Sequence, residues 1–162
     1  MDKDVPVRRS IRLRDFDYSS NNLYFVTICT QDHACLLGKV VENRAFMSPY
    51  GRILEKELLQ LIIHFPLVVL DEYVIMPNHL HVIIGLRASR VVAPTLGQII
   101  GAYKSRVFHE CLELAKIKDK FIGKLWQRNY YEHIIRDEDD LIRIQKYIRN
   151  NPANWTKDKF YS

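Results

Sequence analysis

The segment from His79 to Leu86 places the strongest constraint on the fold, because histidines and apolar residues alternate at its start. Successive side chains of a β-strand point to opposite faces, so a period of two is typical of a strand. In this register Leu80 and Val82 share one face with the apolar residues that follow at every second position, whereas His79 and His81 share the other. The pattern therefore predicts a strand that packs one face on a core and carries two imidazoles on the opposite face.

Apolar segments on both sides of this strand predict further secondary structure. Additional strands are expected at residues 23–30, 68–76 and 125–135, with a weaker candidate at 39–47. Helices are expected from Pro49 to the break at Pro66, over 96–116 and over 137–150. The first two begin at the capping residues Ser48 and Thr95, and acidic residues crowd the first turn of the third.

Without the weak candidate at 39–47, the order is strand, helix, strand, strand, helix, strand, helix. The first six elements form the βαββαβ order of the ferredoxin-like fold, in which helices pack on an antiparallel sheet. We therefore expect an α+β fold of this class, with one more helix at its C-terminal end. The expected organisation is a basic N-terminal arm at 1–22, a single domain at 23–155 and a tail at 156–162.

Composition excludes several classes of protein and favours a polyanionic partner. The 162 residues are enough for one buried core, and 24 Lys and Arg against 19 Asp and Glu give a formal charge of +5. The most apolar run, at 61–70, is short and is interrupted by His64 and Pro66, so no membrane span is expected. Three cysteines without CxxC spacing argue against a disulfide framework and indicate a reducing cytoplasm.

The two histidines of the central strand are candidates for a metal site. Two imidazoles side by side on a sheet can share one divalent ion, although hydrogen-bonded or solvated histidines would give the same pattern. On the last helix, Tyr147 and Asn151 are four residues apart and share a face. Asn151 offers an oxygen ligand, and a tyrosine beside a bound metal can attack a phosphodiester. The alternative is that Tyr147 packs in the core beside Ile148.

These residues lie within longer segments that resemble a known family. The segment MPNHLHVII resembles the HUH motif, two histidines separated by a bulky hydrophobic residue, of single-tyrosine transposases and rolling-circle nucleases. The segments RRSIRLRDFDYSSNNLYFVTICT and LWQRNYYEHIIRDEDDLIRIQKYIRNNP resemble the beginning and the tyrosine-bearing region of REP-associated tyrosine transposases. The resemblance extends from about Arg8 to Pro152, which is most of the chain.

The resemblance implies a metal-dependent endonuclease and strand transferase that acts on single-stranded DNA beside a palindromic hairpin. It implies that Tyr147, on a C-terminal catalytic helix, forms a covalent 5′-phosphotyrosine intermediate, and that His79, His81 and Asn151 bind the metal. The expected cofactor is Mg²⁺ or Mn²⁺, and imidazole ligands favour Mn²⁺. Such a protein would take part in DNA transposition and recombination, in the cytoplasm with the nucleoid, as a monomer or a homodimer.

Basic and aromatic residues suggest where DNA would be bound. Cationic side chains can contact phosphates, and exposed rings can stack on unpaired bases. Each charge taken alone is also compatible with a solvated surface position, and the clustering around the tyrosine segment is what favours a DNA interface. The predicted DNA-binding residues are Arg8, Arg9, Arg12, Arg14, Lys104, Arg106, Trp126, Arg128, Lys146 and Arg149.

Two other functions share these features. A protein that binds DNA hairpins without cutting them would carry the same basic arm and aromatic rings. A metal-dependent RNA phosphoesterase could also use a ferredoxin-like scaffold, but the two HxT motifs of one such class are absent from the sequence. Tyr130 and Tyr131 are alternative nucleophiles, but neither has an amide on its own helix face, so packing or stacking is expected of both.

Overall fold

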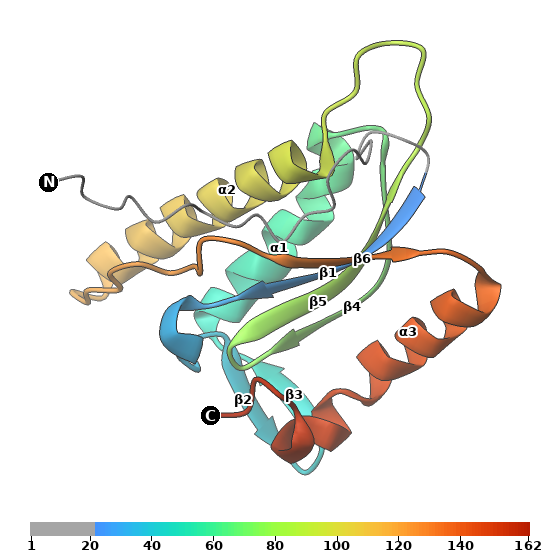
Figure 1. Cartoon of the computed structure of the whole chain (residues 1–162). Helices are drawn as coiled ribbons and strands as arrows, with labels where there is room; N and C mark the ends of the chain where they lie inside the picture. The colour runs from blue at the N-terminus through green and yellow to red at the C-terminus, as the bar shows by residue number, and fades with distance from the viewer. Residues whose placement is uncertain (1–21) are drawn as a thin grey trace, which may run out of the picture.

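The computed structural model describes residues 22–162 (Figure 1). The basic arm expected at 1–22, with Arg8, Arg9, Arg12 and Arg14, lies outside the described residues except for Asn22. Within the described range, none of the helices is long and apolar enough to cross a membrane. The elements in chain order are β1 (Asn22–Cys29), the 3-10 helix η1 (Gln31–His33), β2 (Gly38–Val41), β3 (Arg44–Met47), α1 (Pro49–His64), β4 (Val68–Met76), β5 (His79–Leu86), α2 (Leu96–Ile117), β6 (Tyr131–Ile135), α3 (Glu138–Asn150) and the 3-10 helix η2 (Pro152–Lys157).

A four-stranded antiparallel sheet organises the domain, with the strand order β4-β5-β1-β6. The elements β1, α1, β4, β5, α2 and β6 follow the βαββαβ order, which confirms the ferredoxin-like α+β fold predicted from the sequence. β5 lies in the interior of the sheet, where Thr27 of β1 pairs with His81 and Met76 of β4 pairs with His79. The strand that carries the two histidines is therefore held on both sides.

The weak strand candidate at 39–47 is a hairpin rather than one strand. β2 and β3 pair with each other as a separate two-stranded sheet. Between them Glu42 and Asn43 have φ values of 48° and 62°, the left-handed conformation of a tight two-residue hairpin turn. The sequence has no glycine at this turn, so the alternation of side chains alone does not reveal it.

The strand expected at 125–135 is shorter than the alternation predicts. Only Tyr131–Ile135 pairs continuously with β1, as β6, whereas Trp126 makes a single bridge just beyond the end of β1. The Lys104 ammonium donates to the backbone carbonyl of Gln127 at 2.6 Å. A side chain therefore satisfies a carbonyl that would otherwise need a neighbouring strand.

The helix starts expected from the sequence carry capping hydrogen bonds. Ser48 Oγ accepts a backbone N–H from the first turn of α1 at 3.1 Å. Thr95 and Gln98 form a reciprocal capping box at the start of α2. Asp137 caps α3, since its Oδ1 accepts a backbone N–H of the first turn at 2.8 Å. Local sequence thus determines where all three helices begin.

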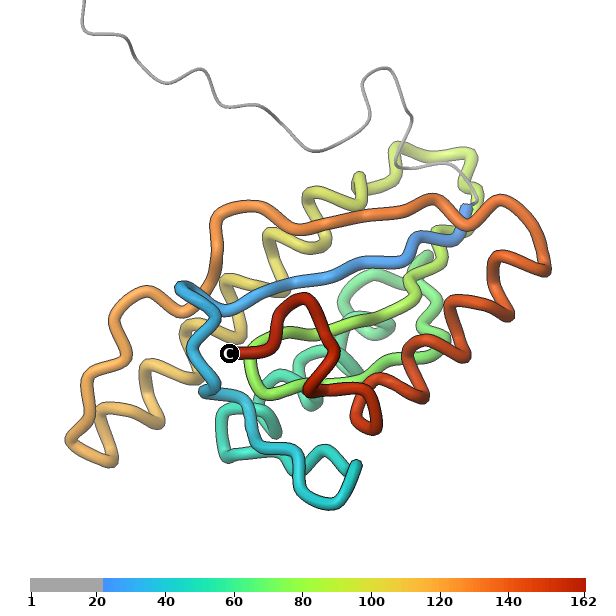
Figure 2. The backbone as a smooth tube through the Cα atoms, turned by 60° about the horizontal axis from the view of Figure 1, so that its bottom comes forward, coloured from blue at the N-terminus to red at the C-terminus, as the bar shows by residue number. Residues whose placement is uncertain are grey.

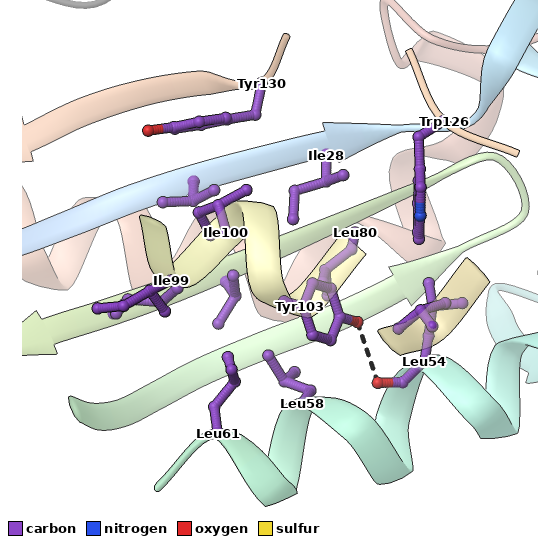
Figure 3. Close-up of a cluster of buried hydrophobic side chains, with 14 of the residues drawn as sticks. Ile28, Leu54, Leu58, Leu61, Leu80, Ile99, Ile100, Tyr103, Trp126 and Tyr130 are labelled. Carbon is purple, nitrogen blue, oxygen red and sulfur yellow. Dashed lines mark hydrogen bonds between the residues drawn. The ribbon is translucent and has the colours of Figure 1, made fainter. Parts of the chain in front are cut away.

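Helices α1 and α2 cover one face of the sheet, and the main core lies between them and the strands (Figure 3). The apolar residues of β5 on this face, which include Leu80 and Val82, are fully buried. Within the cluster the Tyr103 hydroxyl of α2 donates to the Leu54 carbonyl of α1 at 3.0 Å. The predicted core face of the histidine strand is therefore confirmed.

Helix α3 covers the opposite face of the sheet, which carries the histidines (Figure 1). Ile144 and Ile148 of α3 pack on Ile83 of β5 in a smaller buried cluster. Because residues two apart on a strand share a face, α3 also passes beside His81. The histidine face is thus covered by the helix rather than open to solvent.

The C-terminal segment folds back over the same face of the sheet (Figure 2). Trp155 of η2 and Phe160 are buried, and the Phe160 carbonyl accepts a hydrogen bond from Asn78 Nδ2 at 2.7 Å. Asn78 lies in the turn between β4 and β5, next to His79. Residues 156–162, expected as a tail, are therefore in contact with the domain at the position of the histidines.

Candidate active site

His79 and His81 lie side by side on β5, and both are almost fully buried. Their ring centroids are 4.4 Å apart. His79 Nδ1 is hydrogen-bonded to Asn78 Oδ1 at 2.8 Å, and His81 Nδ1 to Thr27 Oγ1 at 2.7 Å. Since the protein engages each Nδ1, the Nε2 atom of each imidazole is the one that can bind a ligand.

The hydrogen bonds of Asn78 determine the tautomer of His79. Asn78 Nδ2 donates to the carbonyls of Phe160 and His33, so Asn78 Oδ1 accepts the proton of His79 Nδ1. The lone pair of His79 therefore lies on Nε2, a buried atom with no hydrogen-bond partner within residues 22–162. A neutral imidazole held through Nδ1, with Nε2 free, is the arrangement of a metal ligand.

Helix α3 brings Tyr147 and Asn151 to the imidazoles, as their spacing of four residues predicts. The Tyr147 hydroxyl lies 3.5 Å from His81 Nε2, and the Tyr147 side chain is 42% exposed. Asn151 is buried, and its Oδ1 has no hydrogen-bond partner in the described part of the chain. The structure thus brings together His79, His81, Tyr147 and Asn151.

Asp158, which no motif or spacing in the sequence marks, also belongs to the site. Ligand atoms of His79, His81 and Asp158 all lie within 4.8 Å of one another. The Asp158 carboxylate also accepts a hydrogen bond from Asn151 Nδ2 at 3.0 Å. The Nε2 atoms of two buried imidazoles, next to amide and carboxylate oxygens, fit a divalent cation such as Mg²⁺ or Mn²⁺.

Burial keeps both imidazoles neutral. It lowers the pKa of His79 to about 4, and the Asp158 carboxylate opposes this effect only in part. Burial, reinforced by the His79 ring, holds the pKa of His81 well below its usual range. Both side chains are therefore in the metal-binding form at neutral pH. Burial and the charge of Asp158 raise the pKa of Tyr147, so its hydroxyl stays protonated unless the phenolate is stabilised.

Two pockets flank Tyr147 and connect the site to solvent. One, of about 270 Å³, lies between the sheet and α3, and Lys159 is among the residues that line it. The other, of about 260 Å³, lies at the end of α3 beside Lys146 and Asn151. Arg143 lines both pockets, so three cationic side chains surround the exposed part of Tyr147.

Two of the predicted DNA-binding residues, Lys146 and Arg149, lie on α3 with Tyr147. Lys146 is exposed and lines a pocket beside the tyrosine. Arg149 Nε donates to Glu72 Oε1 of β4 at 2.8 Å, and this pair fastens α3 to the edge of the sheet. Of these two cations, Lys146 is therefore exposed beside the tyrosine, whereas the charge of Arg149 is partly neutralised by Glu72.

The predicted DNA-binding residues of α2 and the loop after it are mostly engaged within the domain. Arg106 Nε donates to Oε2 of the buried Glu57 at 2.8 Å. Trp126 is buried in the main core, where its indole donates to the Lys104 carbonyl at 3.0 Å (Figure 3). Arg128 is exposed. The Trp126 ring is therefore not available to stack on bases in this structure.

The alternative tyrosines are placed differently from Tyr147. Tyr130 is buried in the main core on the α1 and α2 side (Figure 3). Tyr131 is 46% exposed, and its ring centroid lies 6.0 Å from that of Phe160. His133 is hydrogen-bonded to Asp140 at 2.7 Å and lines the 270 Å³ pocket. Tyr147 differs from these two tyrosines in that its hydroxyl lies 3.5 Å from an imidazole of β5.

The family of IS200-like transposases matches residues 21–151 of the chain. The chain therefore belongs to the IS200-like transposase family. An uncharacterized protein of Haemophilus influenzae is 37% identical over 172 aligned positions, which cover 95% of this chain and 93% of that protein. A candidate REP-associated tyrosine transposase of the same organism is 26% identical over 139 positions, which cover 85% of this chain and 73% of that protein.

Two solved structures share the fold. The structure of a REP-associated tyrosine transposase bound to a REP hairpin aligns with a TM-score of 0.65 at 19% identity, covering 88% of this chain and 73% of that one. The crystal structure of a candidate transposase from Deinococcus radiodurans aligns with a TM-score of 0.52 at 21% identity, covering 86% and 95% of the two chains. The resemblance to REP-associated tyrosine transposases inferred from the sequence is thus confirmed.

Proposed function

We propose that this protein is a metal-dependent single-stranded DNA endonuclease and strand transferase. The observation that supports the proposal is the position of the Tyr147 hydroxyl, 3.5 Å from His81 Nε2. Close by are the buried atoms His79 Nε2 and Asn151 Oδ1, which have no hydrogen-bond partner within residues 22–162. A nucleophile next to a set of metal-ligand atoms is suited to breaking and joining phosphodiester bonds. Membership of a transposase family supports the same activity.

In the proposed reaction the Tyr147 hydroxyl attacks a DNA phosphorus atom and loses its proton to solvent. A bond forms between the phenolic oxygen and phosphorus, and the bond from phosphorus to the 3′ oxygen breaks. The products are a 5′-phosphotyrosine link and, after the departing oxygen takes up a proton, a free 3′-hydroxyl. Attack by a 3′-hydroxyl on this link reverses the step, so strands can be exchanged without ATP.

The proposed cofactor is Mg²⁺ or Mn²⁺, held by His79, His81 and Asn151. A bound divalent cation polarises a phosphate oxygen and offsets the negative charge that develops during the attack. Imidazole nitrogen favours Mn²⁺ over Mg²⁺, because Mn²⁺ accepts softer ligands. The role of the protein is to keep both imidazoles neutral and oriented through their Nδ1 atoms.

The DNA is proposed to lie across α3, where cations surround the exposed part of Tyr147. Arg143, Lys146 and Lys159 line the two pockets beside the tyrosine and can contact phosphates on either side of the cut. Lys159 lies 4.8 Å from the Phe160 ring centroid, so its ammonium is held at the entrance to the site.

Further phosphate contacts are proposed for Arg128 and Arg149, and for the arm that carries Arg8, Arg9, Arg12 and Arg14. Arg128 is exposed on the loop before β6, and Arg149 keeps much of its surface exposed despite its ion pair. Lys104, Arg106 and Trp126 are instead proposed to stabilise the packing of α2, because their contacts are made within the domain.

The proposed substrate is a single strand beside a palindromic hairpin. A structural neighbour with the same fold is a REP-associated tyrosine transposase bound to a REP hairpin. The basic charge of the chain suits a polyanionic partner of this kind. We propose that the protein acts in the cytoplasm at the nucleoid, as a monomer or a homodimer.

The test is incubation of the protein with end-labelled single-stranded hairpin DNA and Mn²⁺, followed by denaturing electrophoresis. We expect a shortened DNA with a free 3′-hydroxyl and a covalent adduct between protein and DNA, both absent with Tyr147→Phe. Binding of the hairpin by the native protein without an adduct would favour a non-cleaving hairpin-binding protein. Cleavage that requires a 2′-hydroxyl would favour an RNA phosphoesterase.

A further inference from the structure

The Asp158 carboxylate lies at the two histidines but comes from the C-terminal segment. Ligand atoms of His79, His81 and Asp158 lie within 4.8 Å of one another. A six-coordinate Mg²⁺ ion with bonds of about 2.1 Å keeps its ligand atoms about 3 to 4 Å apart. A small closing movement of the three side chains would therefore bring all of them to a common ion.

Hydrogen bonds hold the carboxylate in this position. Asp158 Oδ1 accepts the Phe160 N–H at 2.7 Å, and Asp158 Oδ2 accepts from Asn151 Nδ2 at 3.0 Å. Because Nδ2 of Asn151 points to the carboxylate, its Oδ1 is the atom that remains without a partner among the described residues. Asp158 thus orients Asn151 so that an oxygen, and not an N–H group, is available to a cation.

The charge of the site also favours a role for Asp158. An imidazole binds a metal ion in its neutral form, and the Asn151 amide carries no charge. These three side chains alone would therefore form an uncharged set of ligands at a buried position. Taking a dication out of water into such a site is costly unless negative charge compensates it. Asp158 supplies one negative charge at the required distance.

We propose that Asp158 is a further protein ligand of the metal ion, in addition to His79, His81 and Asn151. The proposal rests on the metal site of the proposed function and assigns it an anionic ligand from outside the strand and the helix. Phe160, two residues later, packs its ring 4.8 Å from the His79 ring. A bound ion would therefore add one more link between the C-terminal segment and the sheet, besides the Asn78–Phe160 hydrogen bond.

The first test measures Mn²⁺ affinity of the full chain by isothermal titration calorimetry, without DNA. Asp158→Asn keeps the size of the side chain and removes its charge, and we expect it to weaken Mn²⁺ binding about tenfold or more. Asp119→Asn is the matched control: the same chemical change at an exposed position in the loop after α2, where it should leave the affinity unchanged. Equal affinity of Asp158→Asn and the native protein would overturn the proposal.

A second measurement uses the native protein and does not depend on how the variant folds. Hydrogen exchange at the Phe160 amide, which donates to Asp158, should slow when Mn²⁺ is added. Exchange that is unchanged by saturating Mn²⁺ would also overturn the role of Asp158.

The same titrations separate this proposal from the metal site on which it rests. His81→Ala should abolish Mn²⁺ binding if the histidines hold the ion. Undiminished binding by His81→Ala would overturn the histidine site itself. Loss of binding in His81→Ala together with full binding in Asp158→Asn would reject only Asp158.

Discussion

The hydroxyl of Tyr147, on α3, lies 3.5 Å from Nε2 of His81, on β5. The two residues are distant in sequence, and no strand pairing joins α3 to β5. The contact depends on the neighbouring turns of α3, where Ile144 and Ile148 pack on Ile83, two residues after His81. The distance between the proposed nucleophile and the proposed metal ligand is therefore determined by apolar packing between the helix and the sheet.

We expect Tyr147→Phe to abolish cleavage and leave the affinity for hairpin DNA nearly unchanged. The substitution removes the attacking oxygen and keeps the ring that contacts Phe25 and His81. The rate of cleavage should fall at least about a thousandfold, as when other nucleophiles are removed. Adduct formation is measured by denaturing electrophoresis and binding by a gel-shift titration. Tyr131→Phe, at an exposed tyrosine on β6, is the control, and a covalent adduct with Tyr147→Phe would show that another residue attacks.

The packing of α3 gives a second prediction. Ile148 is fully buried, so Ile148→Ala should lower the free energy of unfolding by about 2–5 kcal/mol, measured by urea denaturation. We also expect slower cleavage by the fraction that remains folded, because the substitution loosens the support of Tyr147. Ile142→Ala, at an isoleucine of the same helix that is 47% exposed, should change both quantities little. Normal cleavage by folded Ile148→Ala would mean that this contact does not position the tyrosine.

The sequence predicts most of this site because its residues follow local rules. Alternation along β5 places His79 and His81 on one face, and the spacing of four on α3 places Tyr147 and Asn151 together. Both relationships hold within a single element. The position of α3 relative to β5 follows from the order of strands and helices, which the sequence pattern also predicts, and from the family resemblance.

Other features depend on contacts between segments distant in sequence. The position of Asp158 follows from the chain reversal after η2, which no spacing rule predicts. The burial of Trp126 arises from a bridge to Thr30 and a hydrogen bond to Lys104, although the residues that follow it in the sequence are polar. The sequence therefore predicts an exposed basic and aromatic surface at a position where the structure has the buried ring of Trp126. Charge and ring counts alone cannot distinguish these two arrangements.

Loss of the metal gives a third prediction. His79→Ala and His81→Ala should each remove most of the Mn²⁺-dependent cleavage, because each lacks one imidazole ligand, and EDTA should do the same to the native protein. His109→Ala, at an exposed histidine of α2, is the control and should cleave normally. Cleavage is followed with labelled hairpin DNA across a range of Mn²⁺ concentrations. Full activity of the native protein in EDTA would exclude a metal requirement.

Arg106 is bonded to Glu57 within the domain, whereas Lys146 is exposed beside Tyr147, and this difference gives a fourth prediction. Arg106→Gln removes the nearer charged partner of Glu57, a carboxylate that is only 2% exposed and also lies 3.8 Å from Lys56, and should lower the free energy of unfolding by about 1–3 kcal/mol. Its affinity for hairpin DNA at fixed salt should stay close to that of the native protein. Lys146→Gln should show the reverse, with weaker binding and unchanged stability. A larger loss of DNA affinity in Arg106→Gln than in Lys146→Gln would place the DNA on the α2 side of the domain.

The depth of the site restricts the form of DNA that can reach it. His79 and His81 are buried beneath α3 and the C-terminal segment, and the pockets beside Tyr147 reach His81 and Asn151. Phe160 packs against both imidazoles and narrows the space above them. A phosphate must therefore leave the surface of the nucleic acid and enter between a helix and a sheet. An unpaired strand can bend in this way, whereas a paired duplex is stiff over the length of the site.

We therefore expect cleavage of single-stranded DNA beside a folded hairpin and little or none of the same sequence annealed to its full complement. An unpaired nucleotide can turn its phosphate towards Tyr147 and stack its base on an exposed ring, for which Tyr131 is better placed than the buried Trp126. The comparison uses one labelled strand in two forms, at the same salt and Mn²⁺ concentration, with binding measured in parallel. If the duplex binds but is not cut, access to Tyr147 is the limiting factor. Equal cleavage of the perfect duplex would contradict a buried site that admits only a flexible strand.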